Sequence, residues 1–76
     1  MNKVLSIEYC TTWKYLPKAV DLAEILLKEH KNSISSLTII PSSDGVFEVK
    51  LNDELIFSKK SLGRFPEKGE VEKLVR

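Results

Sequence analysis

The sequence predicts an α+β fold of two layers, in which a four-stranded mixed sheet carries both helices on one face. Three observations predict it: four short segments alternate apolar and polar residues, two segments have helical apolar spacing, and their order is β-α-β-β-β-α. The long first crossover makes the first two strands parallel, and a tight turn makes the last two antiparallel. All 76 residues are expected to form one domain, 1–76, with a thin core.

The first strand is expected over residues 3–9. Alternate residues of this strand are apolar and share one face: Leu5, Ile7 and Tyr9. The residues that follow, Cys10, Thr11 and Thr12, break the alternation. Either threonine is expected to accept hydrogen bonds from the free N–H groups at the start of the next helix.

The first helix has apolar residues at spacings of three and four. They are Leu16, Ala19, Val20, Ala23 and Leu27, and Leu22, Ile25 and Leu26 widen the apolar stripe. Asn32 is its expected end. Pro17 leaves its start open, because a helix that begins at Trp13 would lose a hydrogen bond and bend at Pro17. A helix that begins nearer Leu16 would hold Pro17 favourably in its first turn.

The other three strands are expected over 37–40, 46–51 and 54–58. Pro41 is expected to stop the first of them, and a turn over 42–45 follows. Asn52 and Asp53 tolerate positive φ and therefore suit a tight hairpin between the last two strands. The core face of these strands is expected to carry Leu37, Ile39, Phe47, Val49, Leu51, Leu55 and Phe57.

The end of the chain is expected to be a polar loop over 59–65 and a last helix over 67–75. Pro66 can open this helix, and its acidic residues come early while its basic residues come late. Gly69 would weaken it by up to ~1 kcal/mol relative to alanine.

Composition excludes several function classes. Twelve Lys and Arg against eleven Asp and Glu leave a net charge of +1, which lacks the basic footprint of a nucleic-acid binder. No apolar stretch is long enough to span a bilayer, and the first residues do not read as a signal peptide. We therefore expect a cytoplasmic protein without nucleic-acid or membrane partners. No metal-ligand cluster, phosphate loop or carboxylate pair stands out, so no metal and no cofactor are expected.

The single cysteine, Cys10, lies between the first strand and the first helix. Free N–H groups and the positive end of the helix dipole stabilise a thiolate at such a place, and Lys14 and Lys18 are nearby in sequence. The alternative is that Cys10 is a small buried hydrophobic residue at a strand end. Position alone leaves both interpretations open.

Several segments carry a resemblance along the whole chain. They are Tyr9–Thr12, the helix after it, Gly45–Val49, Leu55–Lys60 and Gly63–Glu67. Together they resemble the selenoprotein W family, small thioredoxin-like proteins also called the Rdx or SelT/SelW/SelH group. The resemblance implies the same β-α-β-β-β-α architecture and a redox-linked function.

In that family the loop after the first strand carries two redox-active positions separated by two residues. The first falls on Cys10 and the second on Trp13, so the motif here reads Cys10-Thr11-Thr12-Trp13. The resemblance therefore implies half of a redox centre. One hypothesis is an interaction or sensing module, in which Cys10 forms a sulfenic acid or a glutathione adduct. The alternative is a monothiol oxidoreductase with glutathione or a partner thiol as the resolving group.

The expected contact residues lie around the same motif. Tyr15 would contribute to an exposed aromatic patch or close over the core, and Val46 would dock substrate backbone. Phe47 and Phe65 lie in the segments that carry the resemblance and are candidate binding residues. Arg64 belongs to a basic segment with Lys59, Lys60 and Lys68, which is expected either to attract an acidic protein or the carboxylates of glutathione or to be a solvated loop. The expected partners are another protein, glutathione, or both, and the chain is expected to be a monomer or a weak homodimer.

Overall fold

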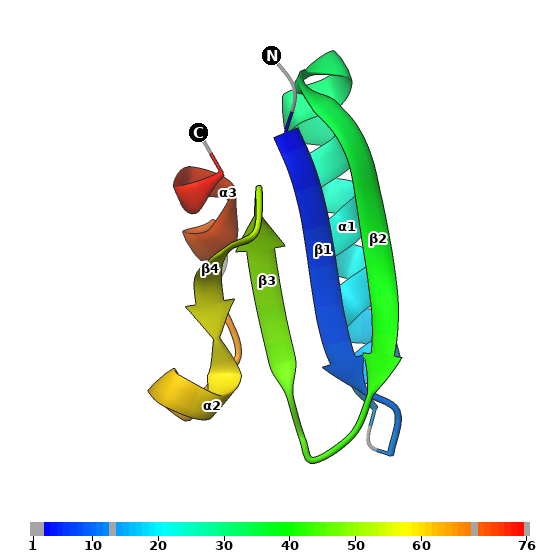
Figure 1. Cartoon of the computed structure of the whole chain (residues 1–76), viewed down its shortest axis with the longest axis vertical. Coiled ribbons are helices and arrows are strands. Elements are labelled where there is room, and N and C mark those ends of the chain that lie inside the picture. Colours follow the sequence, from blue (N-terminus) through cyan, green and yellow to red (C-terminus); the bar gives the residue numbers. More distant parts are fainter. Residues whose placement is uncertain (1–2, 13, 68, 76) are drawn as a thin grey trace.

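The computed structural model describes residues 3–12, 14–67 and 69–75. Its strands are β1 (Lys3–Cys10), β2 (Ile34–Ser42), β3 (Phe47–Leu51) and β4 (Glu54–Ser58). Its helices are α1 (Tyr15–His30), α2 (Lys59–Leu62) and α3 (Glu70–Leu74), with a short 3-10 turn over Lys31–Ser33. The four strands form one sheet in the order β2-β1-β3-β4 (Figure 1).

The predicted strand directions are confirmed. β1 runs parallel to β2, and both β1–β3 and β3–β4 are antiparallel. Asn52 and Asp53 both have positive φ, 51° and 70°, as the tight hairpin between β3 and β4 requires. The predicted α+β fold with a four-stranded mixed sheet is therefore the observed one.

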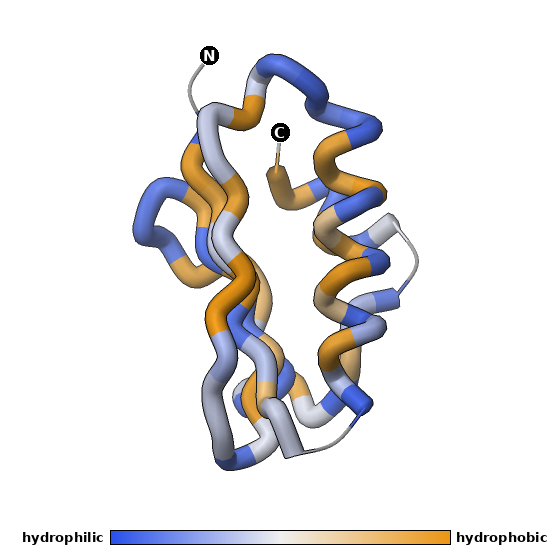
Figure 2. Tube along the Cα trace, turned by 90° about the vertical axis from the view of Figure 1, so that its right-hand side faces the viewer, coloured by the Kyte–Doolittle hydropathy of each residue, from blue (hydrophilic) through white to orange (hydrophobic). Residues whose placement is uncertain are grey.

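One hydrophobic core joins the sheet to the helices. Strand residues Leu5, Ile7, Phe47, Val49 and Phe57 are buried together with Ala19, Leu22, Ala23 and Leu26 of α1 and with Val71 and Val75 at α3. Because α1 and α3 share this core, both lie on the same face of the sheet. Figure 2 shows the strands and α1 as two separate layers.

The start of α1 decides between the two expectations for Pro17. The helix begins at Tyr15, so Pro17 is its third residue, where the missing N–H breaks no helical hydrogen bond. The expected threonine cap is wrong: Lys14 occupies the cap position and no side chain bonds the helix start. Thr11 instead bonds the Ser42 carbonyl oxygen through its N–H (3.1 Å) and its hydroxyl (3.3 Å). At the other end, α1 stops at His30, two residues before the expected Asn32.

The expected stop at Pro41 is wrong, because β2 continues to Ser42. β2 is an edge strand. The Ser42 carbonyl accepts from Thr11, so the polar groups of Ser42 face β1 and those of Pro41 face the outer edge. A proline N without hydrogen is tolerated on that side of an edge strand.

Leu55 was expected on the core face, and this is also wrong. The β3–β4 register pairs Val49 with Phe57 but Lys50 with Leu55, which leaves Ile56 as an extra residue. Such a bulge moves the residues beyond it to the other face. Leu55 is accordingly 47% exposed, while Ile56 packs against the core.

The segment after β4 differs from the expected loop and long helix. Residues 59–62 form α2, whose start is capped by the Ser58 hydroxyl accepting from the Ser61 N–H (3.3 Å). The last helix, α3, begins only at Glu70, and Gly69 precedes it at φ 84° rather than weakening its interior. The left-handed conformation of Gly69 ends the preceding loop and explains the late start.

Candidate functional site

Cys10 is the last residue of β1 and is 1% exposed. Its N–H donates to the carbonyl oxygen of Val46 (2.9 Å), and its partner in β2 is Ser42. The thiol-bearing end of β1 is therefore held between the last residue of β2 and the residue before β3. α1 begins five residues later, at Tyr15, with Lys14 as its cap.

The other residues of the motif are placed differently. Thr11 and Thr12 are exposed in the turn after β1. Trp13, expected at the second redox position, lies outside the described residues. The predicted roles of Cys10, Thr11, Thr12 and Trp13 remain predictions, and the geometry adds that the cysteine is enclosed rather than presented on the surface.

Three rings form an aromatic cluster (Tyr15, Phe47 and Phe65) at this end of the molecule. The Phe65 ring meets Tyr15 edge to face with centroids 4.8 Å apart and meets Phe47 in the same way at 5.3 Å. Such pairs contribute about 0.5–1.5 kcal/mol each beyond area burial. Phe47 is buried, and Tyr15 and Phe65 are half-buried against the core. The three predicted residues thus come together, and Tyr15 packs on the core rather than standing free.

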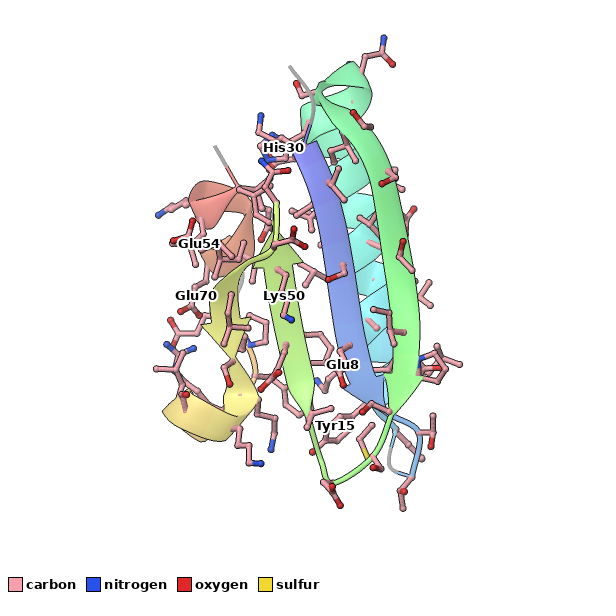
Figure 3. The ribbon with its side chains drawn as sticks, in the orientation of Figure 1. Glu8, Tyr15, His30, Lys50, Glu54 and Glu70 are labelled. Carbon is pink, nitrogen blue, oxygen red and sulfur yellow. The ribbon has the colours of Figure 1, made fainter. Side chains whose placement is uncertain are left out.

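Gly45 connects this cluster to the segment beside Cys10. Its φ is 70°, and a Cβ built on it would lie 3.8 Å from the Tyr15 hydroxyl oxygen. The next residue, Val46, accepts the hydrogen bond of the Cys10 N–H. Figure 3 places Tyr15 at the end of the molecule where β1 ends, opposite the end that holds His30. The cluster and Cys10 therefore belong to one end of the fold.

Two ammonium groups lie over the rings of the cluster. Lys18 Nζ is 4.7 Å from the centroid of Phe65, while Lys59 Nζ is 5.4 Å from Phe65 and 5.6 Å from Tyr15. Sequence reasoning did not connect Lys18 with this cluster. The signal was present, because Lys18 follows Tyr15 by three residues on α1 and so shares its helix face.

Arg64 makes a different set of contacts from those expected of a binding residue. It donates to both Glu70 oxygens, at 2.7 and 3.0 Å, and to the Phe65 carbonyl at 3.2 Å. The Glu67 N–H also donates to Glu70 (2.9 Å). The Arg64 bonds, with this N–H, lower the pKa of Glu70 to about 2, and the same carboxylate raises the pKa of Arg64. Sequence reasoning missed Glu70 as the residue that holds the Arg64–Pro66 segment.

A groove of about 210 Å³ lies between α1 and a wall that contains residues 65–67 and Gly69. Its apolar floor consists of Leu22, Ile25, Phe47, Phe65 and Pro66. Phe47 and Phe65 belong both to the aromatic cluster and to the lining of the groove, so the two features adjoin each other. No part of the sequence pattern indicated it, since its walls come from segments that are far apart in the chain.

Within residues 3–12, 14–67 and 69–75, no group of three His, Cys, Asp or Glu residues could hold a metal ion. In that same part of the chain, no helix is long and apolar enough to cross a membrane. The arrangement places an enclosed thiol at the same end of the fold as a cationic, aromatic surface.

Comparisons with known proteins found one family model and several solved structures that match this chain. The Rdx family model matches residues 4–76. A selenoprotein W-related protein from Vibrio cholerae superimposes with a TM-score of 0.95 and 26% identity, over 100% of this chain and 95% of that one. A protein from Bordetella parapertussis gives a TM-score of 0.93 and 27% identity, over 97% and 94%. Among curated proteins, none matches the sequence.

Proposed function

The chain belongs to the Rdx family, and from this premise we propose that it is a redox-linked protein-interaction module whose sensing thiol is Cys10. The observation that carries the proposal is that the sequence has one cysteine and that this cysteine is 1% exposed. A dithiol cycle needs a second thiol to resolve the mixed disulfide, and no second cysteine is present. Because reactive thiols are normally at least partly exposed, Cys10 can react only when the chain around it opens locally, and such a slow reaction suits a single modification better than continuous turnover.

The proposed sensing reaction is a thiol–disulfide exchange with oxidised glutathione in the cytoplasm. The Cys10 thiolate attacks one sulfur of the glutathione disulfide and forms a new S–S bond. The other glutathione leaves with the electron pair of the broken bond and takes up a proton. Cys10 is oxidised and the leaving glutathione is reduced. The adduct then persists until an external thiol attacks it, because the chain supplies no resolving cysteine.

The surroundings of Cys10 link this reaction to the shape of the site. An adduct at Cys10 cannot fit the enclosed position, so it must displace chain next to β1. The Cys10–Val46 and Thr11–Ser42 hydrogen bonds are the first contacts at risk. Val46 adjoins Gly45, which lies against the Tyr15 hydroxyl, so a displacement there reaches the aromatic cluster. Oxidation would in this way change the surface offered to a partner.

The test compares wild type with Cys10→Ser. We expect one glutathione adduct per chain by intact-mass spectrometry, none in the variant, and amide NMR shifts centred on Thr11, Ser42 and Val46. Native Cys10 should react with iodoacetamide at least about tenfold more slowly than in urea, because reaction needs local opening. A native chain that never forms the adduct, while the urea-unfolded chain does, would contradict the proposal.

One further result would show that the chain is an enzyme rather than a sensor. Glutathione-coupled reduction of a disulfide substrate, abolished by Cys10→Ser, would identify a monothiol oxidoreductase. Sustained turnover is the distinguishing measurement, since a sensor forms its adduct once whereas an enzyme regenerates the thiol in every cycle.

A further inference from the structure

We propose that the groove between α1 and residues 65–67 docks a segment of a partner protein that carries a carboxylate beside a large apolar side chain. This inference rests on the proposed role as a protein-interaction module and names the chemistry of its partner. The carboxylate would lie at Lys18 and Lys59, and the apolar side chain would enter the groove.

The floor of the groove accounts for the apolar part of the partner. Ile25 is 40% exposed and Phe65 is half-buried, and the buried Leu22 and Phe47 line the groove with them. The groove volume of about 210 Å³ is below the roughly 300–1,000 Å³ of sites that enclose a small molecule. A groove of this size suits an anchoring side chain of a protein segment rather than a whole cofactor.

The two lysines account for the carboxylate. Within the described parts of the chain, ion pairs join Lys28 to Glu24 and Arg64 to Glu70, so neither Lys18 nor Lys59 is ion-paired there. Both ammonium groups lie within 5.4 Å of the centroid of the Phe65 ring, which lines the groove, and Lys18 also lines it. An exposed contact between an ammonium group and a ring is weak, about 0.5–1 kcal/mol, and an arriving carboxylate can compete with it.

The border of the groove farther from Lys18 is acidic. It determines which charges the partner segment can carry next to its apolar anchor. Glu72 lies there, while the other acidic residues of the groove are Glu67 and Asp21, and Asp21 follows Lys18 by one turn of α1. Glu72 also lines a second hollow with Glu29 and His30 at the end of α1, so this border lies away from Lys18. A partner segment that is acidic throughout would be repelled there. The charges therefore favour an acidic residue next to the apolar anchor and a neutral or basic residue beyond it.

The test uses the Cys10→Ser chain, so that docking is measured without any thiol reaction. A displayed library of short random peptides is selected on this chain, and the best peptide is labelled with fluorescein for anisotropy. We expect selected peptides to carry Asp or Glu within a few positions of Leu, Phe, Ile or Met. Replacing Lys18 and Lys59 together by Gln should weaken the best peptide about tenfold, which corresponds to about 1.4 kcal/mol.

Two control variants make the result specific. Lys50→Gln removes an exposed lysine next to Val4 and Ile40, away from the groove, and should leave the affinity unchanged. Ile25→Ser should weaken binding while circular dichroism shows that the fold is kept. Selected peptides without acidic residues, equal binding to the double lysine variant, or no peptide tighter than about 1 mM would each overturn the inference.

This outcome is separable from the test of Cys10. An adduct that forms at Cys10 while no peptide binds the groove would leave sensing in place and remove the docking surface. Self-association of the chain that Ile25→Ser abolishes, without peptide binding, would assign the groove to a second copy and also overturn the inference.

Discussion

At the scale of single residues, Glu70 holds the loop between α2 and α3. Its carboxylate accepts two bonds from Arg64 and one from the Glu67 N–H, and these bonds lower its pKa to about 2. A group whose folded pKa lies below its ordinary value of 4.5 stabilises the fold at higher pH. That stabilisation is complete above pH about 4.5 and is lost as pH falls through about 2.

Glu70→Gln should therefore lower the free energy of unfolding at pH 6, and the difference from wild type should shrink between pH 4.5 and 2. Urea unfolding at a series of pH values measures this. Glu24→Gln is the matched control, because it removes a carboxylate whose pair with Lys28 lies on the exposed face of α1. A Glu70→Gln difference that stays constant down to pH 2 would contradict the assignment.

At the scale of elements, Ser58 joins β3, β4 and α2. It is buried, its hydroxyl donates to Glu48 Oε2 (3.0 Å), and it accepts from the Ser61 N–H. Glu48 stands directly opposite Glu8 in the β1–β3 pair. Two like charges in such a pair destabilise a sheet, so a donor to one of them is favourable. The same hydroxyl thus caps the start of α2 and stabilises Glu48, which faces a second carboxylate in the sheet.

Ser58→Ala should cost about 1–2 kcal/mol, because the α2 cap is lost and Glu48 loses its donor. Thermal or urea unfolding measures the loss. Ser61→Ala is the control: its backbone N–H can still donate to Ser58, so it should change stability by less than about 0.5 kcal/mol. Equal losses in the two variants would show that the hydroxyl network contributes nothing.

The elements also show why part of the fold was predictable. Alternation in β1 is a local pattern that matches its buried face. The spacing in α1 predicts the helix but not its whole buried face, because Leu16, Val20 and Leu27 are exposed while Leu22 and Leu26 are buried. The β4 bulge depends on pairing with β3, and the tolerance of Pro41 depends on β2 being an edge strand. Neither is a property of a local segment. A pattern can therefore predict that a strand exists, but not which residues it pairs with or where its register shifts.

The candidate site follows the same rule. Cys10, Tyr15, Phe47 and Phe65 could be named from a motif and a resemblance, whereas the groove and the Arg64–Glu70 contact arise only from tertiary packing. The burial of Cys10 depends on chain folded around the end of β1, so its position in the sequence left both interpretations open.

At the scale of the whole molecule, the core occupies only one side of the sheet. The Cα radius of gyration is 11.5 Å, close to the roughly 11 Å expected for a compact chain of this length. The other sheet face stays open, with Val4 49% and Ile40 39% exposed. A domain of this size has roughly 4–11 kcal/mol of stability. One large cavity in the single core can therefore remove much of it.

Ile7 and Ile40 test this asymmetry with the same side chain on opposite faces of the sheet. Ile7 is fully buried, so Ile7→Ala should cost about 2–5 kcal/mol and leave a partly unfolded chain at room temperature. Ile40→Ala should cost less than about 1 kcal/mol, since little apolar area is lost. Urea unfolding followed by circular dichroism measures both. Equal losses, with the Ile40→Ala loss dependent on protein concentration, would mean that a second copy covers the open face and that the chain is not a monomer.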